Sequence, residues 1–272
     1  MFHRLVSSNV RSIRQLSTRA KQAIPSDDHD LIYGTSSVLA VLHAAKRKPM
    51  RVYLQEHQQE LKKKKDSSLV DEIVDQCRSK NVPLVFTDKG HLNNMTLNKP
   101  HQGVVLKTSR LEPVRISHLS PMDGSTSAAN PNRAPFWIAL DEVQDPQNLG
   151  SILSAPLSAA VSKVSAGAVE FIDIYSTNNL VKFLKACEGW NVVGADVGAE
   201  TTLSVQEFAQ LSRQPTILVL GNEGTGIRTN VKSCCSAFTS IPGRPTQFKG
   251  DVDSLNVGVA AGVLIASATL YA

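Results

Sequence analysis

The sequence predicts an α/β protein with two domains, in which a small N-terminal α/β module precedes a mostly parallel, doubly wound sheet. Three observations support this prediction. Apolar and amphipathic segments alternate between residues 30 and 109, a stretch rich in Ser, Pro, Asn and Gly covers residues 111–134, and strongly apolar strands follow it. A chain of 272 residues is long enough for about two such domains.

Residues 1–25 have the composition of an organelle targeting presequence. MFHRLVSSNVRSIRQLSTRAKQA carries five Arg or Lys residues, five Ser or Thr residues and no acid, and its apolar residues can share one face of a helix. Arg and Ser enrichment without acids on an amphipathic pattern is typical of a transit peptide. We therefore expect a mitochondrial transit peptide that lies outside the fold. A basic arm that contacts nucleic acid is the alternative.

Residues 28–110 predict the small α/β module. Its expected elements are an N-capped helix over residues 30–48, a strand over 50–56, a helix over 62–81, a strand over 82–88 and a closing segment over 101–109. The Lys62–Lys65 run is most simply solvent-exposed, and contact with RNA phosphates is the alternative.

Residues 111–134 predict a linker, and residues 135–272 predict the second domain. The apolar segments FWIALDEV, VEFIDIYS, NVVGADV and TILVLGNEG are its expected strands, and helical segments separate several of them. This alternation is typical of a parallel, doubly wound sheet. Ligands bind such sheets at the carboxyl ends of the strands, so the loops that follow the strands are the candidate sites.

Composition restricts the function classes further. The net charge of +5 favours a polyanionic partner such as RNA, although the presequence contributes to it. No apolar run approaches the roughly 18 residues of a membrane helix. The four cysteines form no C-x-x-C pair and have no His neighbours at metal-ligand spacing, which favours free thiols in a reducing compartment and no structural zinc.

Three loops carry candidate chemistry. DPQNLGSI covers residues 145–152, GNEGTGI covers 221–227, and the third loop runs from Pro242 into the small-residue segment SLNVGVAAGVLIASA, where Ser254 can cap a helix. The glycine spacing of the second loop matches neither the dinucleotide motif nor the phosphate loop. Glu223 within that loop repels phosphate but can accept a hydrogen bond from a hydroxyl group.

Taken together, DPQNLGSI, LVLGNEGTGI and IPGR…DSLNVGVAAGVLI resemble the three ordered motifs of the SpoU (TrmH-like) ribose 2′-O-methyltransferases of the SPOUT superfamily. The resemblance extends to residues 30–108, which are similar to the family's L30e-like RNA-binding domain. It implies a trefoil-knotted SPOUT domain that binds S-adenosyl-L-methionine, needs no metal and forms a homodimer through the knot. With the presequence, it implies a protein of the mitochondrial matrix that modifies a guanosine of the large-subunit rRNA.

The resemblance also implies roles for individual residues. The residues expected to contact the cofactor, largely through backbone groups, are Gly221, Ile241 and Leu255. The residues expected to shape that pocket are Asn222, Glu223, Gly226 and Pro242. The polar residues expected around the reacting ribose, which form the predicted catalytic set, are Asn148, Glu223, Ser254 and Asn256.

One departure from the family pattern affects the expected activity. Relatives carry an arginine six positions after the motif-one asparagine, where it assists deprotonation and grips a phosphate, and here that position is Ser154. Roughly 17 residues of the family pattern are missing at Leu153–Ser154, including this arginine, most of the first helix and the second strand. Losing an acid–base participant typically costs 10²–10⁴-fold in rate. The sequence therefore permits an impaired methyltransferase, an inactive RNA-binding or ribosome-assembly protein, or the product of a missed exon.

Overall fold

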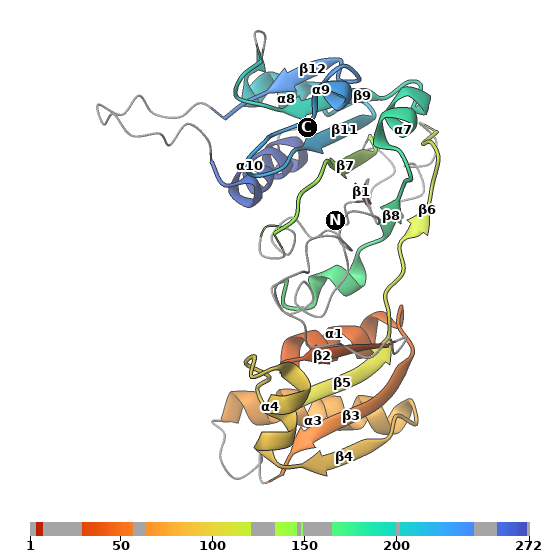
Figure 1. The fold of residues 1–272 in the computed structure, drawn as a ribbon, viewed down its shortest axis with the longest axis vertical. Coiled ribbons are helices and arrows are strands. Elements are labelled where there is room, and N and C mark those ends of the chain that lie inside the picture. The colour runs from red at the N-terminus through yellow and green to blue at the C-terminus, as the bar shows by residue number, and fades with distance from the viewer. Residues whose placement is uncertain are drawn as a thin grey trace, which may run out of the picture. The chain divides into compact units, whose positions relative to one another are not determined.

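The computed structural model describes residues 4–7, 29–56, 64–120, 134–145, 148, 165–199, 202–241 and 255–270. It divides the chain into two compact units (Figure 1). Unit 1 comprises Met1–Ser17, Pro113–Ser154 and Asp173–Ala272, and unit 2 comprises Thr18–Glu112 and Ala155–Ile172. Each unit has strands in one sheet with helices packed on it, so the predicted α/β class is confirmed.

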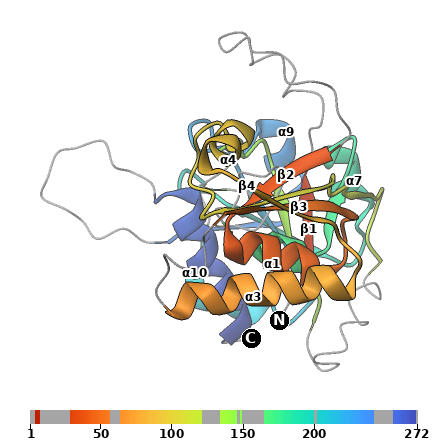
Figure 2. The same cartoon turned by 90° about the horizontal axis from the view of Figure 1, so that it is seen from below.

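Unit 2 is built on a four-stranded mixed sheet with the strand order β2-β5-β3-β4. The strands are β2 (His29–Tyr33), β3 (Pro49–Gln55), β4 (Leu84–Thr87) and β5 (Val104–Ser109). β5 pairs antiparallel with both β2 and β3, and β3 pairs parallel with β4. Helices α1 (Thr35–Ala44) and α3 (Lys64–Ser79) lie on one face, and the shorter α4 (Lys89–Thr96) lies on the other (Figure 2).

Alternation along the strands of unit 2 produces two apolar layers. Val52 and Leu106 point toward α1 and α3, whereas Tyr33 and Val105 point toward Leu92 of α4. Successive side chains of a strand point to opposite faces, so each strand contributes to both layers. The larger layer lies under the two longer helices.

The structure corrects two predictions in this unit. The helix predicted over residues 30–48 is wrong at its start, because residues His29–Tyr33 form β2 and the helix begins only after Gly34. Pairing with β5 outweighs the local helical pattern there. Helix α4 was not predicted from the sequence, because its eight residues KGHLNNMT are too few and too polar to show a clear helical period.

A short segment distant in sequence completes unit 2. The 3₁₀ turn η3 (Ala168–Phe171) packs against α1, where a Cβ atom on Gly167 would lie 2.3 Å from the Ala40 side chain. Arg47, whose side chain is fully buried, donates hydrogen bonds of 2.8 and 3.1 Å to Glu170 and one of 2.6 Å to Asp30. Buried charges require such pairing, so the triad attaches Glu170 to Arg47, which follows α1, and Arg47 to Asp30 of β2.

Unit 1 is built on an eight-stranded sheet in which every pairing is parallel, as predicted. In spatial order the strands are β10 (Thr202–Leu203), β12 (Ala237–Thr239), β9 (Asn191–Ala195), β11 (Thr216–Leu220), β7 (Phe136–Leu140), β1 (Arg4–Ser7), β8 (Ile174–Ser176) and β6 (Val114–Arg115). The helices are α7 (Leu180–Ala186), α8 (Val205–Leu211), α9 (Thr229–Lys232) and α10 (Val257–Leu270). Of the strand predicted over residues 169–176, only Ile174–Ser176 is extended.

Local sequence explains where the elements of unit 1 begin. The five residues of β11, TILVL, are all buried, as expected for a central strand of a sheet covered on both faces. Helix α8 begins with a capping box in which Ser204 and Glu207 each accept from the other's backbone N–H. Helix α7 begins at Asn179, whose side chain accepts a hydrogen bond from Lys182 N–H.

Strand β1 is the clearest departure from the sequence analysis, which placed residues 1–25 outside the fold. Arg4–Ser7 instead lie between β7 and β8, with Leu5 in register with Ile138 on one side and Ile174 on the other. Backbone N–H and C=O groups in a covered sheet need partners, and this segment supplies them. Strand β1 thus lies inside the sheet of a domain in which the second strand of the family pattern was expected to be missing.

The other compositional expectations concern thiols, metals and membranes. All four cysteines are free, and burial raises the pKa of Cys77 and of Cys187 to about 11. Within the described ranges, no group of three or more His, Cys, Asp or Glu side chains is placed to hold a metal ion. The described helices include none that is long and apolar enough to cross a membrane.

Candidate functional site

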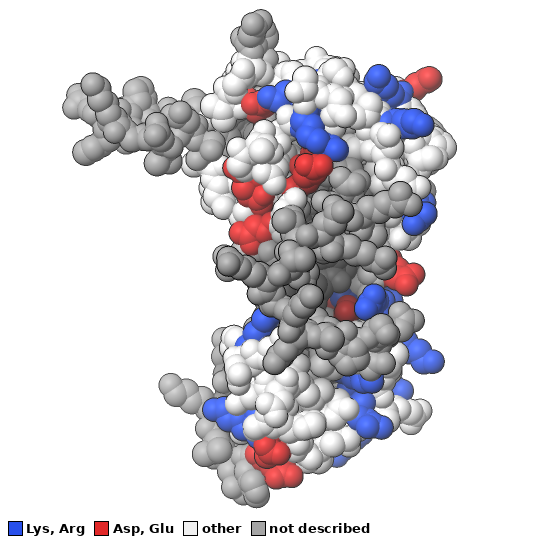
Figure 3. Space-filling view, in the orientation of Figure 1, with Lys and Arg blue, Asp and Glu red and all other residues white. Residues whose placement is uncertain are grey.

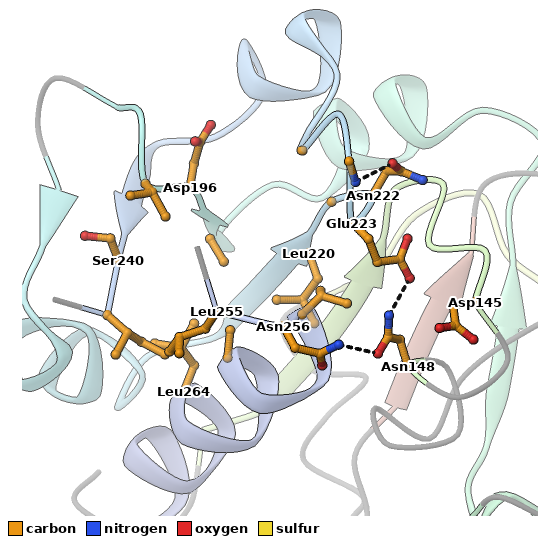
Figure 4. Close-up of a pocket in the computed structure, with 18 of the residues that line it drawn as sticks. Asp145, Asn148, Asp196, Leu220, Asn222, Glu223, Ser240, Leu255, Asn256 and Leu264 are labelled. Carbon is orange, nitrogen blue, oxygen red and sulfur yellow. Dashed lines mark hydrogen bonds between the residues drawn. The ribbon is translucent and has the colours of Figure 1, made fainter. Parts of the chain in front are cut away.

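The segments that follow four strands of unit 1, namely β7, β9, β11 and β12, meet around one cavity of about 780 Å³ (Figure 4). β9 leads into Asp196 and Val197. β7 leads into residues 141–148, β11 leads into the loop 221–228, and β12 leads to Ile241. The N-terminal turn of α10 closes the cavity with Leu255, Asn256 and Val257. Parallel strands end at the same edge of a sheet, so loops far apart in the sequence converge there.

The glycine loop after β11 is shaped by the side chain of Asn222. Its Nδ2 donates to the carbonyl of Glu142 over 2.9 Å, and its Oδ1 accepts from the N–H groups of Gly224 and Thr225. The backbones of Asn222 and Gly226 also exchange two hydrogen bonds. Gly226 has a φ of +68°, which favours glycine, and the loop therefore folds back on itself.

Gly221 shows how tightly this loop folds. A Cβ atom placed on it would lie 2.3 Å from the backbone carbon of Gly226 and 2.4 Å from the N atom of Ile227. No side chain fits there without opening the loop. At Gly224, in contrast, the nearest atom to a Cβ would be 3.6 Å away, which is ordinary contact.

An ion pair joins this loop to the end of β7. Asp141, whose side chain is fully buried, accepts hydrogen bonds from the Arg228 backbone N–H at 2.9 Å, from Nε at 2.8 Å and from Nη2 at 2.5 Å. The hydrogen bonds to Asp141 raise the pKa of Arg228 above its ordinary value. Arg228 also pairs with Glu142 at 3.2 Å. Both ends of the loop 221–228 are therefore attached to residues 141–142.

A chain of side-chain hydrogen bonds crosses one side of the cavity (Figure 4). Asn148 Nδ2 donates to Glu223 Oε1 over 3.0 Å, and Asn256 Nδ2 donates to Asn148 Oδ1 over 2.8 Å. Asn256 Oδ1 in turn accepts from Gly258 N–H, the first turn of α10. Each amide is used as donor and acceptor, so the Glu223 carboxylate is oriented by a relay that starts at the helix.

The charge of the lining is one-sided. Among the described residues that line the cavity, Asp145, Asp196 and Glu223 are acidic and none is Lys or Arg. Asp196 lies across the cavity from Asn148 and pairs with Lys232 of α9 (Figure 4). Burial raises the pKa of Asp196, but the hydrogen bonds from Lys232 and Gly198 N–H lower it by more than burial raises it. The pKa of Asp196 therefore lies below its ordinary value. Asp196 is therefore a carboxylate at neutral pH.

The structure brings together eight residues that the sequence analysis selected. Those that line the cavity are Asn148, Gly221, Asn222, Glu223, Gly226, Ile241, Leu255 and Asn256. Ser254, Pro242 and the Leu153–Ser154 junction lie outside the described residues. Asp196 and the Asp141–Arg228 pair were not predicted from the sequence. Asp196 directly follows the apolar strand NVVGA, so the rule that selected the other loops applies to it as well.

These features favour a ligand that carries positive charge and is held by backbone groups. Carboxylates repel a nucleotide polyphosphate and attract an ammonium or sulfonium group. The oriented Glu223 carboxylate can accept a proton or a hydrogen bond from a hydroxyl group, and the two asparagines can orient that group. The geometry suits transfer of a group from a cationic donor to a hydroxyl acceptor.

Comparisons with known proteins match both parts of the chain. The SpoU rRNA methylase family matches residues 153–266, and a family described as RNA 2′-O ribose methyltransferase substrate binding matches residues 31–114. Human rRNA methyltransferase 1, mitochondrial, is 34% identical over 90% of this chain and 73% of its own length. Its Schizosaccharomyces pombe counterpart is 31% identical over 97% of this chain and 99% of its own length.

A solved structure shows the same fold. The AdoMet-bound rRNA methyltransferase from Sinorhizobium meliloti superposes with a TM-score of 0.62 and 19% identity, over 89% of this chain and 87% of that one. At 19% identity, this similarity shows a shared fold.

Proposed function

Because the chain belongs to the SpoU rRNA methylase family, we propose that it transfers a methyl group from S-adenosylmethionine to the 2′-hydroxyl of a ribose in rRNA. The observation that carries the proposal is the cavity lining, in which the described residues include three carboxylates and no basic side chain. S-adenosylmethionine carries a sulfonium and an ammonium group, which suits this lining. The description of the N-terminal family match supports a ribose target.

Within this proposal, residues of the chain divide into three tasks. Gly221, Ile241 and Leu255 hold the donor, largely through backbone groups, while Asn222, Gly226 and Pro242 keep the pocket in shape. When bound, S-adenosylmethionine supplies an activated methyl carbon, which the ribose oxygen takes with release of a neutral thioether. Asn148, Ser254 and Asn256 orient the ribose, and Glu223 accepts the proton that its hydroxyl group loses.

The target we propose is a guanosine of the mitochondrial large-subunit rRNA. The two relatives compared above are named as mitochondrial rRNA methyltransferases, and the N-terminal composition is that of a presequence. The site of action would then be the mitochondrial matrix. Removal of the presequence on import would also remove β1 from the sheet of unit 1.

We also propose that this chain is a slow enzyme. Ser154 stands where the family pattern has an arginine, and no basic residue lines the described part of the cavity. Without a cation near the reacting ribose, neither its phosphate nor the negative charge that develops on its oxygen is stabilised, and the expected loss is about 10²–10⁴-fold in rate. If the rate of methyl transfer falls to zero, the chain is an inactive RNA-binding protein.

The trefoil knot and the homodimer implied by the family resemblance are part of the same proposal. Helix α10 supports the dimer, because Val259 is 54% exposed and Val263 is 40% exposed in the single chain. Exposed apolar side chains repeated along a helix favour burial against another surface. Analytical ultracentrifugation of the full chain gives the oligomeric state directly.

The cavity chemistry is tested by calorimetric titration with S-adenosylmethionine, with ATP and NAD as anionic controls. We expect S-adenosylmethionine to bind and the two nucleotides to show no measurable heat. Asp196→Asn keeps the size of the side chain and removes one carboxylate charge, so it should weaken binding severalfold. Binding of ATP in preference to S-adenosylmethionine would contradict the proposal.

A further inference from the structure

One face of unit 2 has an uncovered basic area. On the β2-β5-β3 face, helix α4 covers Tyr33 and Val105, and Leu31 and Tyr53 pack partly buried at the edge of this cluster. The ring of Tyr53 lies 6.1 Å from that of His91. Arg51 and Lys107 follow the same alternation as Tyr53 and Val105, and they therefore project from the part of this face beyond α4.

Arg51 and Lys107 are directly opposite each other on neighbouring antiparallel strands. Like charges in this position destabilise a sheet, because their Cβ atoms lie roughly 5 Å apart. Neither side chain forms an ion pair with any residue that the structure describes. No ion pair with a described residue therefore offsets the repulsion between Arg51 and Lys107.

Charge is divided between the two faces of the unit. Helix α4 and the turn after it add the exposed Lys89 and Lys99, with Asp88 as the acid that caps α4. Lys and Arg side chains lie beside α4 and beside the end of β5 in the view onto this face (Figure 3). On the other face, α3 carries Asp71, Glu72 and Asp75 against Arg78 in its described part.

We propose that the area centred on Arg51 and Lys107, extended by Lys89 and Lys99, is the surface on which the backbone phosphates of the substrate RNA lie. Phosphate neutralises the like-charge pair that the protein leaves uncompensated, and two adjacent cations match neighbouring phosphates. The carboxylates in the described part of α3 disfavour RNA on the other face. This inference rests on the proposed function and assigns its RNA-binding surface.

Salt dependence of RNA binding tests the surface. The probe is a transcript of the mitochondrial large-subunit rRNA, titrated with the full-length chain at several salt concentrations. Each phosphate contact adds about 0.7–0.9 to the slope of log K against log salt, so Arg51→Gln/Lys107→Gln should lower the slope by about 1.5. At 0.1 M salt the same relation gives a loss of about 5-fold per charge.

The matched control is Arg78→Gln, which removes an exposed arginine from α3. We expect this variant to bind with the unchanged slope, and we expect neither variant to unfold at a lower temperature than the unsubstituted chain. An unchanged slope in the double variant, or an equal loss in Arg78→Gln, would overturn the assignment of the surface while the proposed function stands. Failure of the unsubstituted chain to bind the transcript would overturn both.

Discussion

Replacing Arg228 by alanine tests whether the Asp141–Arg228 ion pair holds the glycine loop in place. The substitution leaves the Arg228 backbone N–H but removes the two guanidinium bonds to a carboxylate that is 0% exposed. Removing one partner of a fully buried pair costs about 3–5 kcal/mol. The Arg228 side chain is 34% exposed, so water reaches the vacated space and we expect a loss of about 2–3 kcal/mol.

Thermal unfolding followed by circular dichroism measures this loss. For a unit of this size, about 2–3 kcal/mol corresponds to a decrease of roughly 5–10 °C in Tm. We expect the decrease to be accompanied by weaker binding of S-adenosylmethionine, because the loop loses its attachment to β7. Lys185→Ala, which removes an exposed charge from α7, is the control and should change Tm by less than about 1 °C.

A second substitution separates the buried charge from lost packing. In Asp141→Asn/Arg228→Ala the carboxylate is neutral, so the double variant should recover much of the stability that Arg228→Ala loses. The ion pair does not hold the loop if Arg228→Ala leaves Tm unchanged, or if the double variant loses more stability than the two single variants lose together.

Three further predictions concern the cavity and the sheet. Gly221→Ala should abolish binding of S-adenosylmethionine in calorimetry, because its Cβ would lie 2.3 Å from the backbone of the same loop. Gly224→Ala is the control and should bind normally, because the atom nearest to its Cβ would be 3.6 Å away. Equal binding by both variants would show that the loop has room for a side chain at Gly221. Glu223→Gln should lower kcat by about 10²-fold with donor affinity nearly unchanged, because it removes the proton acceptor but keeps an oxygen that can accept the hydrogen bond from Asn148. An unchanged kcat would show that another group accepts the proton. Val6→Pro should lower the free energy of unfolding by about 2–4 kcal/mol in urea titration, because a proline in a strand paired on both sides loses a ladder bond; an unaltered midpoint would show that β1 is dispensable.

Much of this site was predictable because its geometry follows from local rules. The strands FWIAL and TILVL are continuous apolar runs, and parallel strands end at a common edge, so the loops that follow them are candidate sites. The assignment of Asn148 and Glu223 to one site came from the resemblance to the SpoU motifs. What the loops do next was not predictable. Whether Asn256 reaches Asn148 depends on the path of α10, and the Asp141–Arg228 pair joins residues 87 positions apart.

The missed elements have physical reasons of their own. Strand β1 consists of four residues whose composition matches a presequence, and only its two neighbouring strands make it extended. Residues 30–33 follow a helical pattern, but their pairing with β5 decides the outcome. Residues 168–171 pack against α1, and Glu170 pairs with Arg47, a partner 123 positions away that no local pattern indicates.

Methyl transfer to rRNA is the central claim, and its most direct test uses radiolabelled S-adenosylmethionine with a large-subunit rRNA transcript. The modified nucleotide is then located by its resistance to alkaline cleavage, since a 2′-O-methyl group removes the hydroxyl that attacks the phosphate. We predict slow incorporation at a single guanosine that is lost in Glu223→Gln. Binding of both the donor and the transcript without any incorporation would contradict the claim and identify the chain as an inactive RNA-binding member of its family.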